Sequence, residues 1–120
     1  MMIIRSYRDL EVWQRALDLA IRTHRMSARL PRFERFELGS QLRRAATSVP
    51  ANIAEGHGRF YRGDYLHHLS NARGSLMELE THLYIVERLD YIGTTELTPL
   101  RDRSDHVSRM ISRLAMRLRR

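Results

Sequence analysis

The chain has 120 residues, of which 42% are hydrophobic and 29% charged, and its formal net charge is +7 at pH 7. This length suits one domain with one core, and the composition argues against both a disordered chain and a membrane-spanning one. The absence of cysteine excludes disulfides and thiolate chemistry. We therefore expect a single domain over residues 1–120. Because no long apolar run follows Arg5, we also expect no secretory signal and a cytoplasmic location.

Arginine supplies all of the positive side-chain charge, since the 21 basic residues are arginines and lysine is absent. Guanidinium groups match the geometry of phosphates and stack on bases, which favours a nucleic-acid partner. Codon usage in a GC-rich genome would also replace lysine with arginine, without any selection for binding. The net charge is therefore the stronger indication of such a partner.

The first predicted helix begins at Asp9, which suits an N-cap, and stops before Pro31. Arginines recur here at every seventh position, which places them on one side of the helix. Such a stripe suits a phosphate-tracking surface. However, Glu11 and Asp18 each precede an arginine by four residues, the orientation that favours intrahelical ion pairs, and we favour a solvated face. The stripe comprises Arg8, Arg15, Arg22 and Arg29.

The second predicted helix begins near Glu34 to Phe36, and its apolar spacing continues through Pro50. A proline inside a helix removes one hydrogen bond and crowds the preceding turn, so we expect a kink between Ala46 and Pro50. Gly56 is expected to end this helix in the left-handed conformation of a C-terminal cap.

Two further helices follow, one from Gly63 or Asp64 to about Tyr91, and one that reaches the C-terminus after Thr98 as N-cap and Pro99 in its first turn. No strand-like alternation of useful length occurs between them. Four amphipathic helices with mostly short connections predict an all-α, antiparallel, up-down-up-down four-helix bundle with its second helix kinked at Pro50.

No pattern in the sequence supports catalysis, a metal or a cofactor. The ExxH signature of di-metal bundles does not occur, although histidines and carboxylates share helix faces. Gly56 and Gly58 resemble part of a phosphate loop, but they follow a helix rather than a strand. No serine lies in a nucleophile elbow. We therefore expect a protein that is not an enzyme, with neither metal nor cofactor.

Arg43 and Arg44 lie on different sides of the second helix, so at least one must border a packed surface. A contact with RNA would explain the pair, but we favour a structural role in ion pairs within the chain or with a neighbouring subunit. The expected structural polar network comprises Arg43, Arg44, Asn52, Glu55, Arg73, Glu78 and Glu80.

The best candidates for contact with a single strand of nucleic acid are Arg59, Phe60, Tyr61 and Arg62, where aromatic residues lie between arginines. Arginines on the outer stripes are further candidates. They are the stripe of the first helix, Arg8, Arg15, Arg22 and Arg29, and that of the last, Arg109, Arg113, Arg117 and Arg120.

Three segments together resemble the four helix bundle protein family, also called 23S rRNA-intervening sequence proteins: LEVWQRALDLA, ERFELGSQLRRAATSVPANIAEGHGR and GSLMELETHLYI. The similarity extends from Tyr7 to about Tyr91, with the last helix similar only in pattern. It implies a helical bundle that assembles as a homopentamer, with no catalytic residues to transfer. Val49 departs from the isoleucine usual before the proline. The family pattern falls on Gln41, Arg43, Arg44, Ala45, Pro50, Asn52, Ile53, Ala54, Glu55, Gly56, Gly58, Arg59, Gly74, Ser75, Glu78 and Glu80.

A more distant similarity connects this family to accessory proteins of diversity-generating retroelements, which are basic pentameric barrels that bind nucleic acid and a reverse transcriptase. The leading hypothesis is therefore a non-enzymatic oligomer that binds RNA or other nucleic acid through basic surfaces. The alternative is a protein-interaction scaffold that does not itself recognise nucleic acid.

Overall fold

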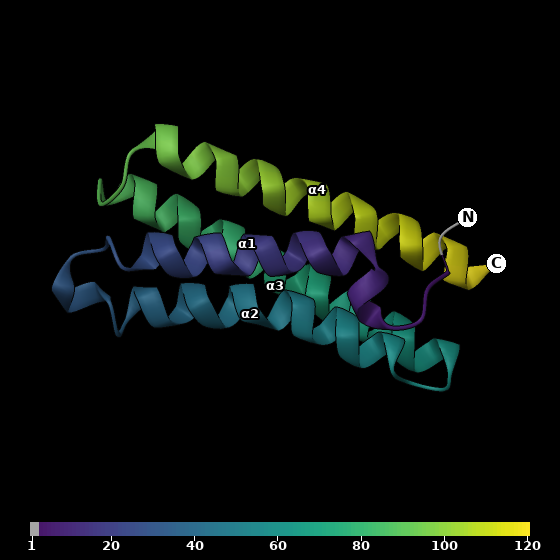
Figure 1. Cartoon of the computed structure of the whole chain (residues 1–120). Coiled ribbons are helices and arrows are strands. Elements are labelled where there is room, and N and C mark those ends of the chain that lie inside the picture. Colours follow the sequence, from purple (N-terminus) through teal and green to yellow (C-terminus); the bar gives the residue numbers. More distant parts are fainter. Residues whose placement is uncertain (1–2) are drawn as a thin grey trace.

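The computed structural model describes residues 3–120, which form four long helices and no strand (Figure 1). Residues 1 and 2 lie outside this range. They belong to the N-terminal segment in which no secretory signal was expected. The predicted all-α four-helix bundle is confirmed. The helices are α1 at Glu11–Ser27, α2 at Leu38–His57, α3 at Arg62–Arg88 and α4 at Thr94–Arg119, with short 3-10 helices η1 at Tyr7–Asp9 and η2 at Arg32–Glu34.

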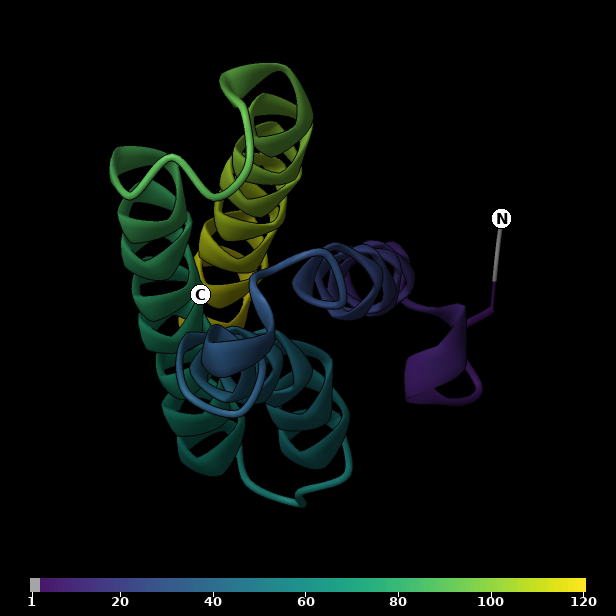
Figure 2. The same ribbon diagram turned by 90° about the vertical axis from the view of Figure 1, so that its left-hand side faces the viewer.

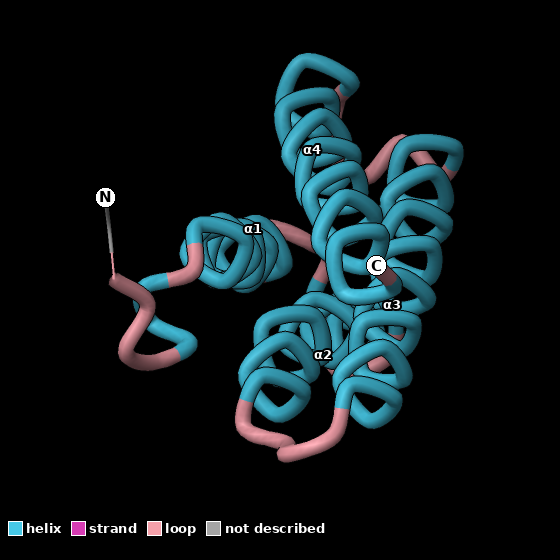
Figure 3. The backbone as a smooth tube through the Cα atoms, turned by 90° about the vertical axis from the view of Figure 1, so that its right-hand side faces the viewer, coloured by secondary structure: helices cyan, strands magenta, loops and turns pink. Residues whose placement is uncertain are grey.

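The helices contact one another in a ring: α1 packs on α2, α2 on α3, α3 on α4, and α4 on α1. Figure 1 shows that successive helices run in opposite directions, so the α2–α3 connection lies at the same end as the C-terminus. The α1–α2 and α3–α4 connections lie at the other end. Figures 2 and 3 show α1 standing to one side of the other three helices, and a groove of about 860 Å³ separates part of it from α4.

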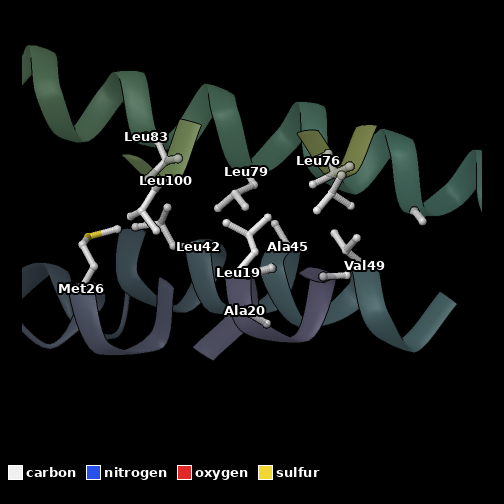
Figure 4. Packing of buried hydrophobic residues seen from close by; sticks show 14 of the residues in the cluster. Leu19, Ala20, Met26, Leu42, Ala45, Val49, Leu76, Leu79, Leu83 and Leu100 are labelled. Carbon is white, nitrogen blue, oxygen red and sulfur yellow. The ribbon is translucent and has the colours of Figure 1, made fainter. Parts of the chain in front are cut away.

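Leucine, isoleucine and valine side chains from all four helices fill the core (Figure 4). Leu42, Ile53, Leu76 and Leu83 are fully buried, as the helical spacing predicts. Each such side chain contributes roughly 1.5–3 kcal/mol through the apolar surface that it removes from water. The core therefore fixes which face of each helix is exposed.

The start of α1 differs from the prediction, because Asp9 does not cap it. The Asp9 carboxylate instead accepts hydrogen bonds from the backbone amides of Arg5, at 2.8 Å, and Ser6, at 3.2 Å, in a capping box that opens η1. α1 begins at Glu11 and ends at Ser27, short of Pro31. Arg8 consequently lies outside α1, and the predicted stripe of four arginines does not belong to one helix.

Gly56 does not form the predicted left-handed cap. α2 begins at Leu38, later than expected, continues through Pro50 and ends at His57, with Gly58 as its C-cap in the right-handed helical region. Gly56 is buried inside α2, where a β-carbon would stand 2.9 Å from Cβ of His68 and 3.0 Å from Cδ1 of Tyr65. Close packing against α3 therefore explains this glycine. The kink near Pro50 stays a prediction.

The starts of the last two helices were also placed too late. α3 begins at Arg62 after Tyr61, so Asp64 lies in its first turn and is not the N-cap. α4 begins at Thr94, because the carbonyl of Gly93 accepts hydrogen bonds from the amides of Glu96, at 3.1 Å, and Leu97, at 3.2 Å. A complete turn therefore precedes Thr98 and Pro99.

The packing at Gly56 predicts that Gly56→Ala lowers the free energy of unfolding by about 1–3 kcal/mol, since the methyl group has no room. Gly74→Ala is the matched control, because no atom lies within 4 Å of a β-carbon there and alanine is the better helix former. It should stabilise the protein by about 0.5–1 kcal/mol. Urea unfolding measures both, and equal effects at the two positions would contradict this account.

Candidate functional site

The C-terminal half of α4 carries arginine without compensating acid. From His106 to Arg120 the sequence contains no aspartate or glutamate. Arg109 pairs with Asp105 of the preceding turn, at 3.1 Å. Within the described residues, the remaining arginines of this segment form no ion pair, so their guanidinium groups are available to an outside ligand. These are Arg113, Arg117, Arg119 and Arg120.

The α2–α3 connection presents two aromatic side chains between arginines. Phe60 is 99% exposed and Tyr61 is 74% exposed. Arg59 lies 3.9 Å from Glu55 in a solvent-exposed pair, and Arg62 forms no ion pair within residues 3–120. Such an exposed pair contributes little free energy, so Arg59 exchanges partners at little cost.

These two segments lie at one end of the bundle, and Figure 3 looks onto it. Tyr65 lies in the first turns of α3 at this end: burial raises the pKa of its hydroxyl, and the positive charge of Arg117 partly opposes that shift. We call the surface made by these arginines the basic end. It comprises Arg59, Arg62, Arg113, Arg117, Arg119 and Arg120, with Glu11, Glu55 and Asp64 as neighbouring carboxylates.

A chain of hydrogen bonds holds α2 against α3 beneath the connection. The Asn52 amide nitrogen donates to the carbonyl oxygen of Ser48, at 2.8 Å, and to its hydroxyl, at 3.0 Å. Its Oδ1 therefore accepts from Nδ1 of His68, at 3.1 Å. The same ring nitrogen lies 3.2 Å from Glu55, and the hydroxyls of Ser48 and Ser75 are 2.7 Å apart. The segment before the basic end is thus tied to α3 at several points.

The two stripe arginines that lie on α1, Arg15 and Arg22, are paired, as the predicted solvated face requires. Arg15 lies 3.0 Å from Glu11 and Arg22 lies 2.9 Å from Asp18, which confirms both intrahelical ion pairs. Arg103 from α4 also reaches Asp18, at 3.3 Å. Burial alone would raise the pKa of Asp18, but the hydrogen bonds and charges of these two arginines lower it overall.

The other members of the two predicted stripes differ in their surroundings. Arg29 pairs with Glu96 across the α1–α4 interface. The guanidinium of Arg8 lies over the Tyr7 ring, with 4.8 Å between its carbon and the ring centroid. The two predicted stripes therefore differ: Arg15, Arg22 and Arg29 of the first are paired, whereas Arg113, Arg117 and Arg120 of the second form no ion pair within residues 3–120.

Arg43 joins α2 to the preceding segments. Its guanidinium donates to the Ser27 hydroxyl, at 3.1 Å, and to the Arg35 carbonyl oxygen, at 2.9 Å. Arg44 is exposed and borders a shallow hollow with His24 and Thr47. Within residues 3–120, neither arginine pairs with Glu55, Glu78 or Glu80, the partners suggested by the sequence.

The expected polar network is thus divided among separate sites. Glu78 pairs with His82 at 3.4 Å, and Arg73 is exposed beside the α3–α4 interface. Burial raises the pKa of Glu80, and the carboxylate of Asp105 adds to that shift, while the Ser104 hydroxyl opposes it.

Sequence reasoning missed one polar contact between α3 and α4. Arg101 pairs with Glu87 at 2.7 Å, and its guanidinium carbon lies 4.7 Å from the centroid of the Tyr84 ring. No local signal identifies this contact, because the partners lie on different helices.

No group of three or more histidine, aspartate or glutamate side chains within residues 3–120 is arranged to hold a metal ion. Across the same residues, every helix is too short or too polar to cross a bilayer.

The sequence pattern of the 23S rRNA-intervening sequence protein family matches residues 8–113. The chain belongs to this family. The match covers all of α1, α2 and α3 and most of α4, and so it includes the α2–α3 connection with Phe60 and Tyr61. The resemblance found from three segments of the sequence is confirmed.

A solved structure supports the fold of this 23S rRNA-intervening sequence protein. It is the crystal structure of a protein of unknown function from the S23 ribosomal protein family of Bacteroides thetaiotaomicron VPI-5482. The two chains are 24% identical with a TM-score of 0.82, and the alignment covers 87% of this chain and 97% of that one. A comparison with functionally curated proteins gave no match.

The partial burial of Glu80 predicts a pH-dependent stability. Because its pKa is raised in the folded state, its contribution is present below the ordinary pKa of a glutamate and is lost as the pH rises through the raised value. Glu80→Gln should therefore raise the free energy of unfolding at pH 7.5, by under about 1 kcal/mol, with no gain at pH 3.

Glu78→Gln is the control, since it removes the same charge from an exposed side chain on the same helix. Urea unfolding at both pH values measures the two variants. An equal gain from both substitutions would show that net charge, rather than burial of Glu80, causes the effect.

Proposed function

We propose that this 23S rRNA-intervening sequence protein is a non-enzymatic cytoplasmic protein that binds RNA or other nucleic acid through its basic end. The observation that carries the proposal is the group of unpaired arginines on α4, at the same end of the bundle as the arginines of the α2–α3 connection. Clustered guanidinium groups bind phosphates and release counterions from the nucleic acid, which is the main source of sequence-independent affinity.

The opposite end of the bundle is less suitable for this role. There, Arg29 pairs with Glu96 and Arg101 with Glu87, although other arginines at that end, such as Arg32 and Arg35, form no ion pair within residues 3–120. Glu34 also lies at that end, where it accepts a hydrogen bond from the Tyr91 hydroxyl, at 2.9 Å. The unpaired arginines at that end are interspersed with Glu34 and Glu37, whereas no acid occurs from His106 to Arg120, so the basic end is the favoured surface.

Assembly into a homopentamer, as the family resemblance implies, is part of the proposal. Each copy carries a net charge of +7, so an oligomer presents several basic ends to one strand. Contacts by linked sites raise the overall affinity well beyond that of one site. Light scattering on the purified protein measures the number of subunits.

A protein-interaction scaffold is the second candidate, and the outer face of α3 favours it. Tyr84, Ile85 and Leu89 are 51%, 39% and 49% exposed there. With Thr81 and Arg88 they line a shallow, mostly apolar hollow of about 420 Å³. If a protein partner stays bound after nuclease treatment and Tyr84→Ala releases it, the scaffold is the better description.

The test of nucleic-acid binding compares two fourfold arginine-to-glutamine variants that remove equal charge. One replaces the unpaired arginines Arg113, Arg117, Arg119 and Arg120, and the control replaces the paired arginines Arg15, Arg22, Arg29 and Arg109. Fluorescence anisotropy with a labelled 20-nucleotide RNA, over a series of salt concentrations, measures the affinity of each.

The first variant should bind at least about tenfold more weakly than the control at low salt. The slope of log affinity against log salt concentration should also be shallower than that of the control. Each lost contact with single-stranded RNA reduces this slope by roughly 0.7, so four lost contacts reduce it by up to about 3. Equal losses in the two variants would mean that net charge alone attracts RNA. Absence of binding by the unmodified protein at low salt would exclude the proposed function.

A further inference from the structure

The side chains of Phe60 and Tyr61 are exposed and are not part of the hydrophobic core. Phe60 is 99% exposed, and within the described residues it contacts no other aromatic ring. Exposing a large apolar side chain forgoes the free energy of burying it. Arginines flank the two aromatic residues on both sides, and no acid occurs between Gly56 and Gly63.

The connection that carries these side chains is short and fixed at both ends. The amide of Gly58 donates to the Ala54 carbonyl oxygen and that of Arg59 to the Gly56 carbonyl oxygen, both at 3.1 Å. On the other side, the amide of Tyr65 donates to the Tyr61 carbonyl oxygen at 3.2 Å. The Tyr65 hydroxyl also lies 3.4 Å from Nδ1 of His57, which joins α2 to α3. The backbone that presents the two rings is therefore already ordered, which lowers the entropy lost on binding.

We propose that the basic end takes single-stranded nucleic acid, with unpaired bases stacked on Phe60 and Tyr61 and the phosphates bound by the surrounding arginines. This inference rests on the proposed function and names its ligand class. Bases within a duplex are stacked on each other, and the major groove of an RNA duplex is too deep and narrow for side chains to read. Only a single strand offers free base faces to exposed aromatic rings.

A protein partner fits this surface less well. An aromatic anchor in a protein interface usually fills a pocket inside an apolar core, with charged residues at the rim. Here, Arg59 and Arg62 are the immediate sequence neighbours of the two aromatic residues, and unpaired arginines of α4 lie at the same end. The charge at the centre of this surface thus complements a polyanion with exposed aromatic bases.

The first experiment measures the affinity of the full chain for a 12-nucleotide oligouridine strand and for a 12-base-pair RNA duplex, at one salt concentration. The test variant is Phe60→Ala/Tyr61→Ala. Its matched control is Phe33→Ala/Phe36→Ala, which removes aromatic residues that are 72% and 84% exposed at the opposite end. Neither variant changes the charge of the chain.

The unmodified protein should bind the strand more tightly than the duplex. Loss of one stacked base costs about 5- to 150-fold in affinity, so the test variant should lose at least about fivefold for the strand. Its affinity for the duplex and the salt dependence for either ligand should not change, because no arginine is removed. The control should behave like the unmodified protein.

A second experiment detects stacking directly. Phe60→Trp places a fluorescent ring at the proposed site, and Phe36→Trp places one at the opposite end. Both variants also keep the native Trp13. Oligouridine should quench the first variant more strongly than the second. Equal quenching would contradict stacking at residue 60.

The outcomes separate the two proposals. If the α4 arginine variant loses RNA affinity while Phe60→Ala/Tyr61→Ala binds the strand normally, the nucleic-acid function stands and the single-strand inference is wrong. Preference for the duplex would also overturn the inference. If the unmodified protein binds neither ligand, both proposals fail together.

Discussion

The position of the α2–α3 connection depends on how closely α2 approaches α3 at Gly56, where a β-carbon would collide with His68 and Tyr65. The two helices are close enough here for the side chains of Asn52 on α2 and His68 on α3 to form a hydrogen bond. The two helices therefore end and begin at fixed positions, and only residues 58–61 lie between them. A connection this short cannot fold back over the bundle, so the aromatic side chains it carries point into solvent. The packing of α2 on α3 thus places these two aromatic side chains at the surface.

Charge is distributed over this frame according to which helices face each other. Arg15 and Arg22 of α1 and the arginines of the first half of α4 have carboxylate partners, as Asp18 shows by contacting both Arg22 and Arg103. Beyond Asp105 the sequence of α4 offers no acid, and the facing part of α3 supplies few. The last turns of α4 therefore carry positive charge with no acid from their own helix beside it. The net charge alone, which codon usage could explain, contains no such information.

The fold class could be predicted from the sequence because amphipathic spacing depends on local periodicity alone. Helix ends were less predictable, because capping rules compete: a turn closed by the Gly93 carbonyl starts α4 before the signal at Thr98 and Pro99. Gly56 was assigned a local role, whereas its constraint comes from side chains on another helix. For the site, Arg59 to Arg62 could be selected locally from the alternation of aromatic and basic residues. Separating unpaired from paired arginines required tertiary contacts, such as that of Arg29 with Glu96.

The central claim is that nucleic acid lies across the basic end. Ultraviolet crosslinking of the full chain to a uridine-rich RNA strand, followed by mass spectrometry of the crosslinked peptides, tests it most directly. The account predicts crosslinks at Phe60 and Tyr61, with neighbouring crosslinks confined to the last turns of α4. Crosslinks concentrated on α1, or at Phe33 and Phe36 at the other end of the bundle, would contradict it.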